Sequence, residues 1–107
     1  MKKLRKINDN FYEFYCPGCK HEHPYEVPRW TWNESLENPT FSPSLLCNST
    51  INEGKFRCHL FVENGCIKYC SDCFHELKGQ TVEMVVLDEE NDYWINKNGK
   101  PVHMFGI

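Results

Sequence analysis

The amino-acid sequence predicts a small, mainly β domain with an antiparallel, zinc-ribbon-like fold and one short helix. Short runs of aromatic and β-branched residues, which favour strands, alternate with Pro, Gly and Asn residues that interrupt them. Seven Cys and five His occur among 107 residues, and Cys-x-x-Cys pairs of the kind found in zinc sites are present. Together these observations predict short strands organised around a bound zinc ion.

The length and charge of the chain set further limits. A chain of 107 residues corresponds to one domain, so we expect a single zinc-binding domain over 1–107, with 1–10 as a flexible tail and 88–107 as a C-terminal hairpin. The formal net charge of −3 gives no general attraction to phosphate backbones, so nucleic acid is not an expected partner. The charged N-terminus and the lack of a long apolar stretch predict a cytoplasmic protein without membrane contact.

The expected elements follow in order along the chain. The aromatic run 11–15 leads into a turn at 16–19, and 21–27 returns antiparallel to it. Further strands are predicted at 29–33, 45–51 and 81–87, and a last hairpin over 93–105 turns at 98–99. Two prolines make 38–44 irregular. The helix is expected over 73–78, with Ser71 or Asp72 as its N-cap and Gly79 at its end.

A second hairpin is predicted within 55–69, because Asn64-Gly65 is the preferred centre of a two-residue turn. The pairs on one face would be Glu63 with Cys66, Phe61 with Lys68 and His59 with Cys70. The pairs on the other, more apolar face would be Cys58 with Ser71, Leu60 with Tyr69 and Val62 with Ile67. This register places Asp72 within reach of His59, on the face opposite Cys58.

The first predicted metal ligands are Cys16 and Cys19, because a Cys-x-x-Cys turn presents both thiolates to one ion. The spacing of the distal cluster favours Cys70 and Cys73 as the remaining pair, whereas the hairpin faces favour Cys58 with a partner from the short helix. Our preferred set is Cys16, Cys19, Cys58 and His75, with Cys73, Cys70 and His23 as alternates. Three residues without a close partner in the sequence are expected to be packing or surface residues: Cys47, Cys66 and His103.

A set of motifs occurs in a specific order along 11–87. The motifs are Cys16-Pro-Gly-Cys19, His23, Trp30-Thr-Trp-Asn33, Pro39-Thr-Phe-Ser-Pro-Ser44, Arg57-Cys-His59, Gly65, Asp72-Cys-x-His75 and Gly79-Gln-Thr-Val82. In combination they resemble a family of small uncharacterised proteins of bacteriophages, with relatives beside bacterial ubiquitin-like conjugation genes. The resemblance implies a peptidase that trims or removes a ubiquitin-like protein, with an origin in phages or bacterial defence. The name ammonia monooxygenase, often given to this family, has no support in a chain without a copper or di-iron ligand set.

The sequence also offers a catalytic triad for such a peptidase. An acyl-bond hydrolase needs a nucleophile, a base that accepts its proton and an acid that orients the base. We predict His59 as the base and Asp72 as the orienting acid, because the hairpin register brings them to one face. Ser44 is the preferred nucleophile and Ser42 the alternate, since Ser44 and Leu45 both keep backbone N–H groups for an oxyanion.

Two other functions are weighed against the serine peptidase. The first is a non-enzymatic zinc-ribbon module that binds another protein through exposed aromatic residues: Tyr25, Trp30, Trp32 and Phe41. Aromatic runs in a small β domain more often fill its core, which disfavours this interpretation. The second is a metal-dependent hydrolase, whose ligands would be His23, His59, His75 and Asp72. Its ligand order differs from the familiar His-Glu-x-x-His helix, and the Cys-x-x-Cys pairing is typical of a closed structural site.

Overall fold

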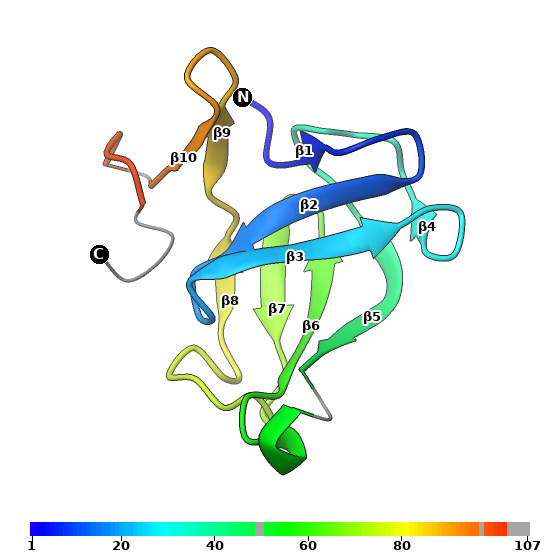
Figure 1. Cartoon of the computed structure of the whole chain (residues 1–107), viewed down its shortest axis with the longest axis vertical. Coiled ribbons are helices and arrows are strands. Elements are labelled where there is room, and N and C mark those ends of the chain that lie inside the picture. Colours follow the sequence, from blue (N-terminus) through cyan, green and yellow to red (C-terminus); the bar gives the residue numbers. More distant parts are fainter. Residues whose placement is uncertain (49–50, 97, 103–107) are drawn as a thin grey trace.

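The computed structural model describes residues 1–48, 51–96 and 98–102, and their regular structure is almost entirely β (Figure 1). The strands are β1 (Arg5–Lys6), β2 (Phe11–Cys16), β3 (His21–Glu26), β4 (Thr31–Trp32), β5 (Phe41–Cys47), β6 (Cys58–Glu63), β7 (Cys66–Tyr69), β8 (Thr81–Glu83), β9 (Val86–Asp88) and β10 (Tyr93–Ile95). A single 3₁₀ turn, η1 (Ile51–Gly54), is the one helical element among the described residues. No helix in these ranges is long and apolar enough to cross a membrane.

The strands form three antiparallel sheets. Five strands pair in the order β4-β5-β6-β7-β8, three in the order β1-β2-β3, and β9 pairs with β10. In Figure 1 the ribbons of β2 and β3 cross the face of the five-stranded sheet. The main core lies between these two sheets, where Phe14 and Tyr25 of the smaller sheet meet Phe41, Leu60 and Ile67 of the larger one. The mainly antiparallel β fold predicted from the sequence is therefore confirmed.

The hairpin at Asn64-Gly65 has the predicted register. Its pairs are Leu60 with Tyr69, Phe61 with Lys68, Val62 with Ile67 and Glu63 with Cys66. Asn64 and Gly65 have φ angles of 47° and 78°, as the left-handed turn requires. Beyond the end of β7, the Cys70 amide donates to the His59 carbonyl at 2.9 Å, which keeps these two residues opposite each other. The alternation of β6 follows: Cys58, Leu60 and Val62 are buried, whereas His59 and Phe61 are partly exposed.

The predicted helix over 73–78 is wrong, because 71–79 forms a succession of turns and bends. The backbone of this segment is bonded to other parts of the fold. The Phe74 amide donates to the Arg57 carbonyl at 2.9 Å, and the Gly79 amide donates to the Cys70 carbonyl at 3.3 Å. These tertiary hydrogen bonds outweigh a weak local helix propensity.

The other strands agree with the predicted ranges in part. The strands expected at 11–15 and 21–27 are present as β2 and β3, whereas 29–33 contributes only the short β4. The strand expected at 45–51 begins earlier, includes Pro43 and ends at Cys47, and 49–50 lie outside the described residues. The single strand expected at 81–87 is divided into β8 and β9, which belong to different sheets.

The last hairpin turns where the sequence predicts, but its first strand pairs elsewhere. The Gly99 amide donates to the Asn96 carbonyl at 2.9 Å, and Ile95 bridges to Pro101. The regular partner of β10 is nevertheless β9, which precedes it in the chain. Residues 97 and 103–107, including His103, lie outside the described residues.

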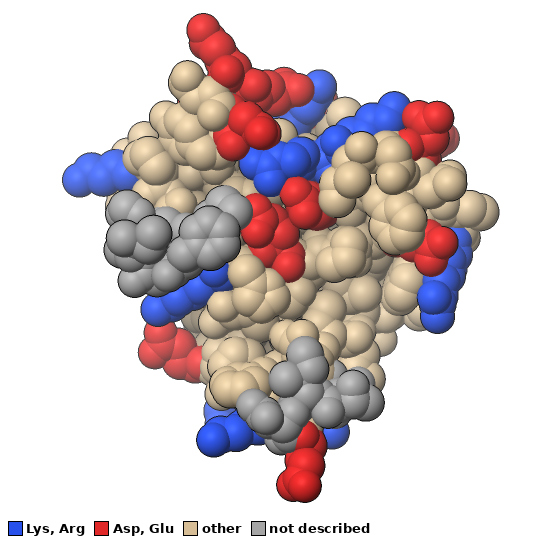
Figure 2. All heavy atoms as spheres, in the orientation of Figure 1, with Lys and Arg blue, Asp and Glu red and all other residues tan. Residues whose placement is uncertain are grey.

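The first residues of the chain are packed against the fold. Leu4 is 1% exposed and belongs to the main core. Arg5 pairs with Glu13 of β2 and with Asp92, at 2.9 Å in each case. On the face of the molecule shown in Figure 2, Lys and Arg residues are interspersed with Asp and Glu residues.

Candidate active site and metal centre

Ser44 lies at an irregularity between β5 and β6. Phe41 pairs with Val62 and Leu45 pairs with Leu60, so the three residues 42–44 stand opposite Phe61 alone. Extra residues on one strand bend it and change the direction of its side chains, which frees the Ser44 hydroxyl from the regular pleat. The Trp30 indole N–H donates to the Ser44 carbonyl oxygen at 3.2 Å and holds the backbone at this position.

The side chains of Ser44, His59 and Asp72 meet on the outer face of the five-stranded sheet. His59 Nε2 lies 3.0 Å from Ser44 Oγ, within hydrogen-bond distance. His59 Nδ1 lies 3.4 Å from Asp72 Oδ1. Ser42, the alternate nucleophile, pairs instead with Thr31 of β4 and is exposed. The hydroxyl that faces the imidazole is therefore that of Ser44, and the three side chains lie in the same order as the hydroxyl, imidazole and carboxylate of a Ser-His-Asp triad.

The turn after β7 positions both His59 and Asp72. The Cys73 thiol donates to the His59 carbonyl at 3.1 Å, and the His59 amide lies 3.3 Å from the same sulfur. These contacts fix the His59 backbone on both sides. Asp72 precedes Cys73 in this turn, and its Oδ2 lies 3.9 Å from Arg57 Nη1. Arg57 and Cys73 therefore contact Asp72 and His59 from outside the group, and these contacts depend on the tertiary fold rather than on sequence spacing.

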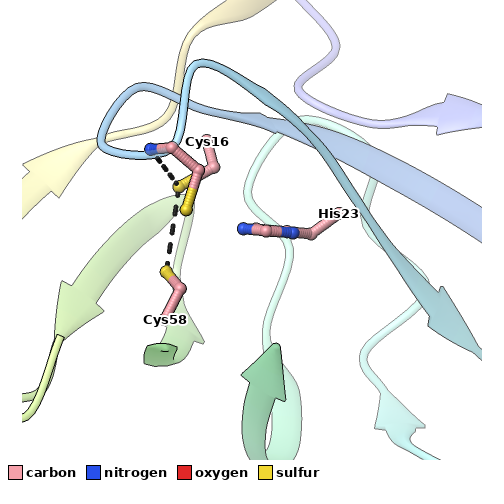
Figure 3. A group of neighbouring side chains, drawn as sticks. Cys16, His23 and Cys58 are labelled. Atoms are coloured by element: carbon pink, nitrogen blue, oxygen red, sulfur yellow. Dashed lines mark hydrogen bonds between the residues drawn. The ribbon is translucent and has the colours of Figure 1, made fainter. Parts of the chain in front are cut away.

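A compact group of possible metal ligands lies on the inner side, close to the start of β6. The ligand atoms of Cys16, Cys19, His23 and Cys58 all lie within 4.8 Å of one another. Figure 3 shows the His23 ring pointing toward the thiols of Cys16 and Cys58. The end of β2, the following turn, β3 and β6 each contribute one ligand. A set of three thiols and one imidazole suits tetrahedral zinc.

The burial and the hydrogen-bond partners of the individual side chains are consistent with a metal ion in this group. His23 is 2% exposed, and its Nε2 has no hydrogen-bond partner among the described residues. A buried ring nitrogen without a partner is costly, and a bound metal ion would satisfy it. Hydrogen bonds from Cys19 and Cys58 lower the pKa of the Cys16 thiol well below its usual range, and the same contacts raise the pKa of the Cys19 and Cys58 thiols, so the three thiols titrate as one group. The Tyr69 hydroxyl also lies 3.0 Å from Cys16 Sγ.

His75 is the fourth metal ligand that the sequence favours, and its hydrogen bonds differ from those of His23. Its Nδ1 accepts from the Leu77 amide at 3.3 Å, so this nitrogen carries no proton in the neutral ring. The proton is then on Nε2, which lies 3.4 Å from Cys58 Sγ. His75 thus faces the Cys58 sulfur as a hydrogen-bond donor. Its ring also packs on Gly18, where an added Cβ would overlap three ring atoms.

The remaining cysteines are distributed over different environments. Cys73 groups with Cys58 and His75, and Cys70 groups with His59 and Asp72. Cys47 pairs with Cys58 across the β5–β6 ladder, and burial raises the pKa of its thiol to about 12, which keeps it protonated. Cys66 lies at the start of β7 and belongs to none of the Cys, His and carboxylate groups found among the described residues.

The aromatic residues weighed as a binding surface lie largely in the core. Tyr25 and Phe41 are buried, and their rings stack with centroids 3.9 Å apart. Trp30 and Trp32 pack against the same core and are partly buried. These contacts leave little of the aromatic run for a partner.

Residues 2–70 match the model of a protein family described as "bacterial ubiquitination-like system serine protease (BubE)". The match covers well over half of the chain and includes Ser44, His59 and the four metal-ligand candidates of the inner group, whereas Asp72 follows its end. The description places the family in a bacterial system, so the phage origin drawn from the sequence stays a prediction. No curated protein and no solved structure matches the chain.

Proposed function

The chain belongs to the family of bacterial ubiquitination-like system serine proteases, and we propose that it hydrolyses an acyl bond in a ubiquitin-like protein or its conjugates with Ser44 as nucleophile. The observation that carries this proposal is the position of His59 between two partners. Its Nε2 lies 3.0 Å from the Ser44 hydroxyl and its Nδ1 lies 3.4 Å from Asp72. One imidazole facing a hydroxyl and a carboxylate is the arrangement that general-base activation of serine requires.

The reaction follows from this geometry. His59 Nε2 takes the hydroxyl proton as Ser44 Oγ attacks the carbonyl carbon, and Asp72 stabilises the imidazolium that forms. The imidazolium then gives its proton to the leaving amine, which departs and leaves an acyl ester on Ser44. His59 next deprotonates a water molecule that attacks this ester, which releases the carboxylic acid product and restores the Ser44 hydroxyl. The backbone N–H groups of Ser44 and Leu45 remain the predicted oxyanion donors.

The surroundings of the triad suit a protein substrate. Leu46 pairs with His59 across the β5–β6 ladder, so both side chains are on the same face of the sheet. Leu46 is 49% exposed, and the ring of Phe61 stacks beside His59 with centroids 6.4 Å apart. These apolar side chains are available to an extended chain end that lies over the sheet.

The inner group is assigned to a structural zinc ion held by Cys16, Cys19, His23 and Cys58. When bound, zinc would tie the β2–β3 turn to β6, and it takes no part in the bond cleavage. His75 supports the site through its hydrogen bond to the Cys58 sulfur, as outer partners of metal ligands commonly do. We expect His23→Gln to lose zinc and His75→Gln to retain it when metal content is measured. His21→Gln, at an exposed position, serves as the control and should retain zinc. Zinc retained by His23→Gln and lost by His75→Gln would contradict the assignment.

The peptidase proposal is tested with fusions of a ubiquitin-like protein to a reporter protein. Wild type and Ser42→Ala should cleave the fusion, whereas Ser44→Ala and His59→Ala should not. Ser42→Ala is a close control because it also removes a serine hydroxyl from β5, two positions before Ser44. A serine-directed fluorophosphonate should label Ser44 in wild type. Cleavage by Ser44→Ala at the wild-type rate, or labelling elsewhere than at Ser44, contradicts the proposal.

A further inference from the structure

A third group of ligand atoms overlaps the catalytic triad. The ligand atoms of His59, Cys70 and Asp72 lie within 4.8 Å of one another on the outer face of the sheet. Catalysis by the triad does not require the Cys70 thiol. On the basis of the proposed function, we propose that His59, Cys70 and Asp72 form a second, inhibitory zinc site that blocks the active site when it is occupied.

The distances within this group favour a single ion. Two ligands of one tetrahedral zinc ion lie roughly 3.3–3.8 Å apart, given Zn–N and Zn–O bonds of about 2.0–2.2 Å and Zn–S bonds of about 2.3 Å. His59 Nδ1 and Asp72 Oδ1 are already separated by 3.4 Å. The backbone bond from Cys70 N to His59 O, at 2.9 Å, keeps Cys70 beside the imidazole. The side chains of His59 and Cys70 are half-buried and that of Asp72 is exposed, so none of the three is locked in a tightly packed core.

The chemistry of the three ligands selects the metal. Thiolate and imidazole ligands favour zinc over magnesium or calcium, which prefer oxygen. One thiolate and one carboxylate balance the two positive charges of the ion. Arg57 lies near Oδ2 of Asp72, at 3.9 Å, and leaves Oδ1 free for the metal. Only three protein ligands are present in this group, so a water molecule completes the tetrahedron.

Occupancy would stop catalysis by changing the tautomer of His59. An imidazole that binds zinc through Nδ1 carries its proton on Nε2. Nε2 is the nitrogen that faces Ser44, and a protonated Nε2 has no lone pair to accept the hydroxyl proton. Binding releases one proton, from the Cys70 thiol, while the imidazole proton moves from Nδ1 to Nε2. No oxidant or reductant is involved.

A role for Cys70 as a nucleophile is less consistent with its surroundings. Burial, with Asp72 nearby, raises the pKa of the Cys70 thiol above its ordinary value. The thiol is then protonated at neutral pH and is a poor nucleophile. A metal ion, in contrast, displaces that proton on binding.

The test compares zinc binding and active-site labelling in the same proteins. Wild type, Cys70→Ser and Cys66→Ser are prepared with the inner metal site filled and dialysed against buffered zinc. Wild type and Cys66→Ser should each take up about one more zinc ion per chain than Cys70→Ser. Cys66 is the matched control because it is a partly buried cysteine on β7, the strand that Cys70 follows. It belongs to none of the ligand groups found among the described residues. Equal zinc uptake by wild type and Cys70→Ser overturns the proposal.

Each protein is then labelled with the fluorophosphonate with and without zinc, and compared with itself. Zinc should slow labelling of Ser44 in wild type and Cys66→Ser but leave Cys70→Ser unchanged, whereas equal slowing in all three overturns the inference. If wild type is not labelled without zinc, the peptidase proposal fails while zinc uptake still decides the second site. Should Cys70→Ser misfold, cobalt added to zinc-loaded wild type provides the decision. A thiolate-to-cobalt absorption band that forms without release of the bound zinc supports the second site, and the absence of such a band contradicts it.

Discussion

Replacing Asp72 with Asn tests how strongly the carboxylate supports His59. The substitution keeps the size of the side chain but removes its charge. At the 3.4 Å between Nδ1 and Oδ1, Coulomb's law gives about 1.2 kcal/mol in bulk water and about 4.9 kcal/mol at an effective dielectric constant of about 20. Because the Asp72 side chain is 43% exposed, the lower part of this range applies, about 1–3 kcal/mol. This corresponds to a loss of rate of roughly 5-fold to 150-fold.

The rate to measure is that of fluorophosphonate labelling of Ser44, followed by intact-protein mass spectrometry, because it needs no knowledge of the natural substrate. Asp9→Asn is the control, since it removes the same charge from a side chain that is 94% exposed and pairs only with Lys6 among the ion pairs described. Labelling of Asp72→Asn within twofold of wild type would refute the role of Asp72. A folded Asp72→Asn that is as inactive as His59→Ala would refute the calculated magnitude.

The metal centre leads to three further predictions. Tyr69→Phe removes the hydroxyl 3.0 Å from Cys16 Sγ and should lower zinc affinity about 10-fold to 100-fold in competition with a chelator, whereas Tyr93→Phe should leave it unchanged. Cys47→Ser should retain zinc because Cys47 belongs to none of the ligand groups found among the described residues, while Cys58→Ser should lose it; equal metal contents would contradict this. Burial lowers the pKa of His75, so the unfolded chain binds the proton more readily and stability should fall as pH drops below about 6.5. The free energy of unfolding, measured with urea at several pH values, should fall less steeply with decreasing pH in His75→Gln than in wild type. An unchanged pH dependence in this variant would show that His75 is not the cause.

The parts of the fold that are predictable from the sequence depend on local signals. Asn64-Gly65 specifies a tight turn by its backbone conformation, and the register of β6 and β7 then follows by counting residues. The same counting places His59 beside Asp72 before any tertiary contact is known. The helix predicted over 73–78 is absent, because the amides of Phe74 and Gly79 bond to the carbonyls of Arg57 and Cys70 outside the segment, and no local helix pattern reports such bonds.

The site depends on two features that residue spacing does not contain. Ser44 reaches His59 because β5 has extra residues between Phe41 and Leu45, and this irregularity exists only through pairing with β6. The fourth metal ligand is ambiguous in the sequence because His23 and His75 are both near cysteines. The contacts of their ring nitrogens favour His23: Nδ1 of His75 accepts an amide proton, whereas Nε2 of His23 is buried without a partner among the described residues.

Cys58 and His59 are neighbours on β6 whose side chains point to opposite faces of the sheet. One residue belongs to the proposed metal site and the next to the proposed catalytic triad, and a single peptide bond separates them. In the proposed assignment, a chain without zinc lacks the tie between the β2–β3 turn and the start of β6, the strand that carries His59. On the proposed assignments, binding of the structural metal and placement of the general base are therefore coupled through one strand.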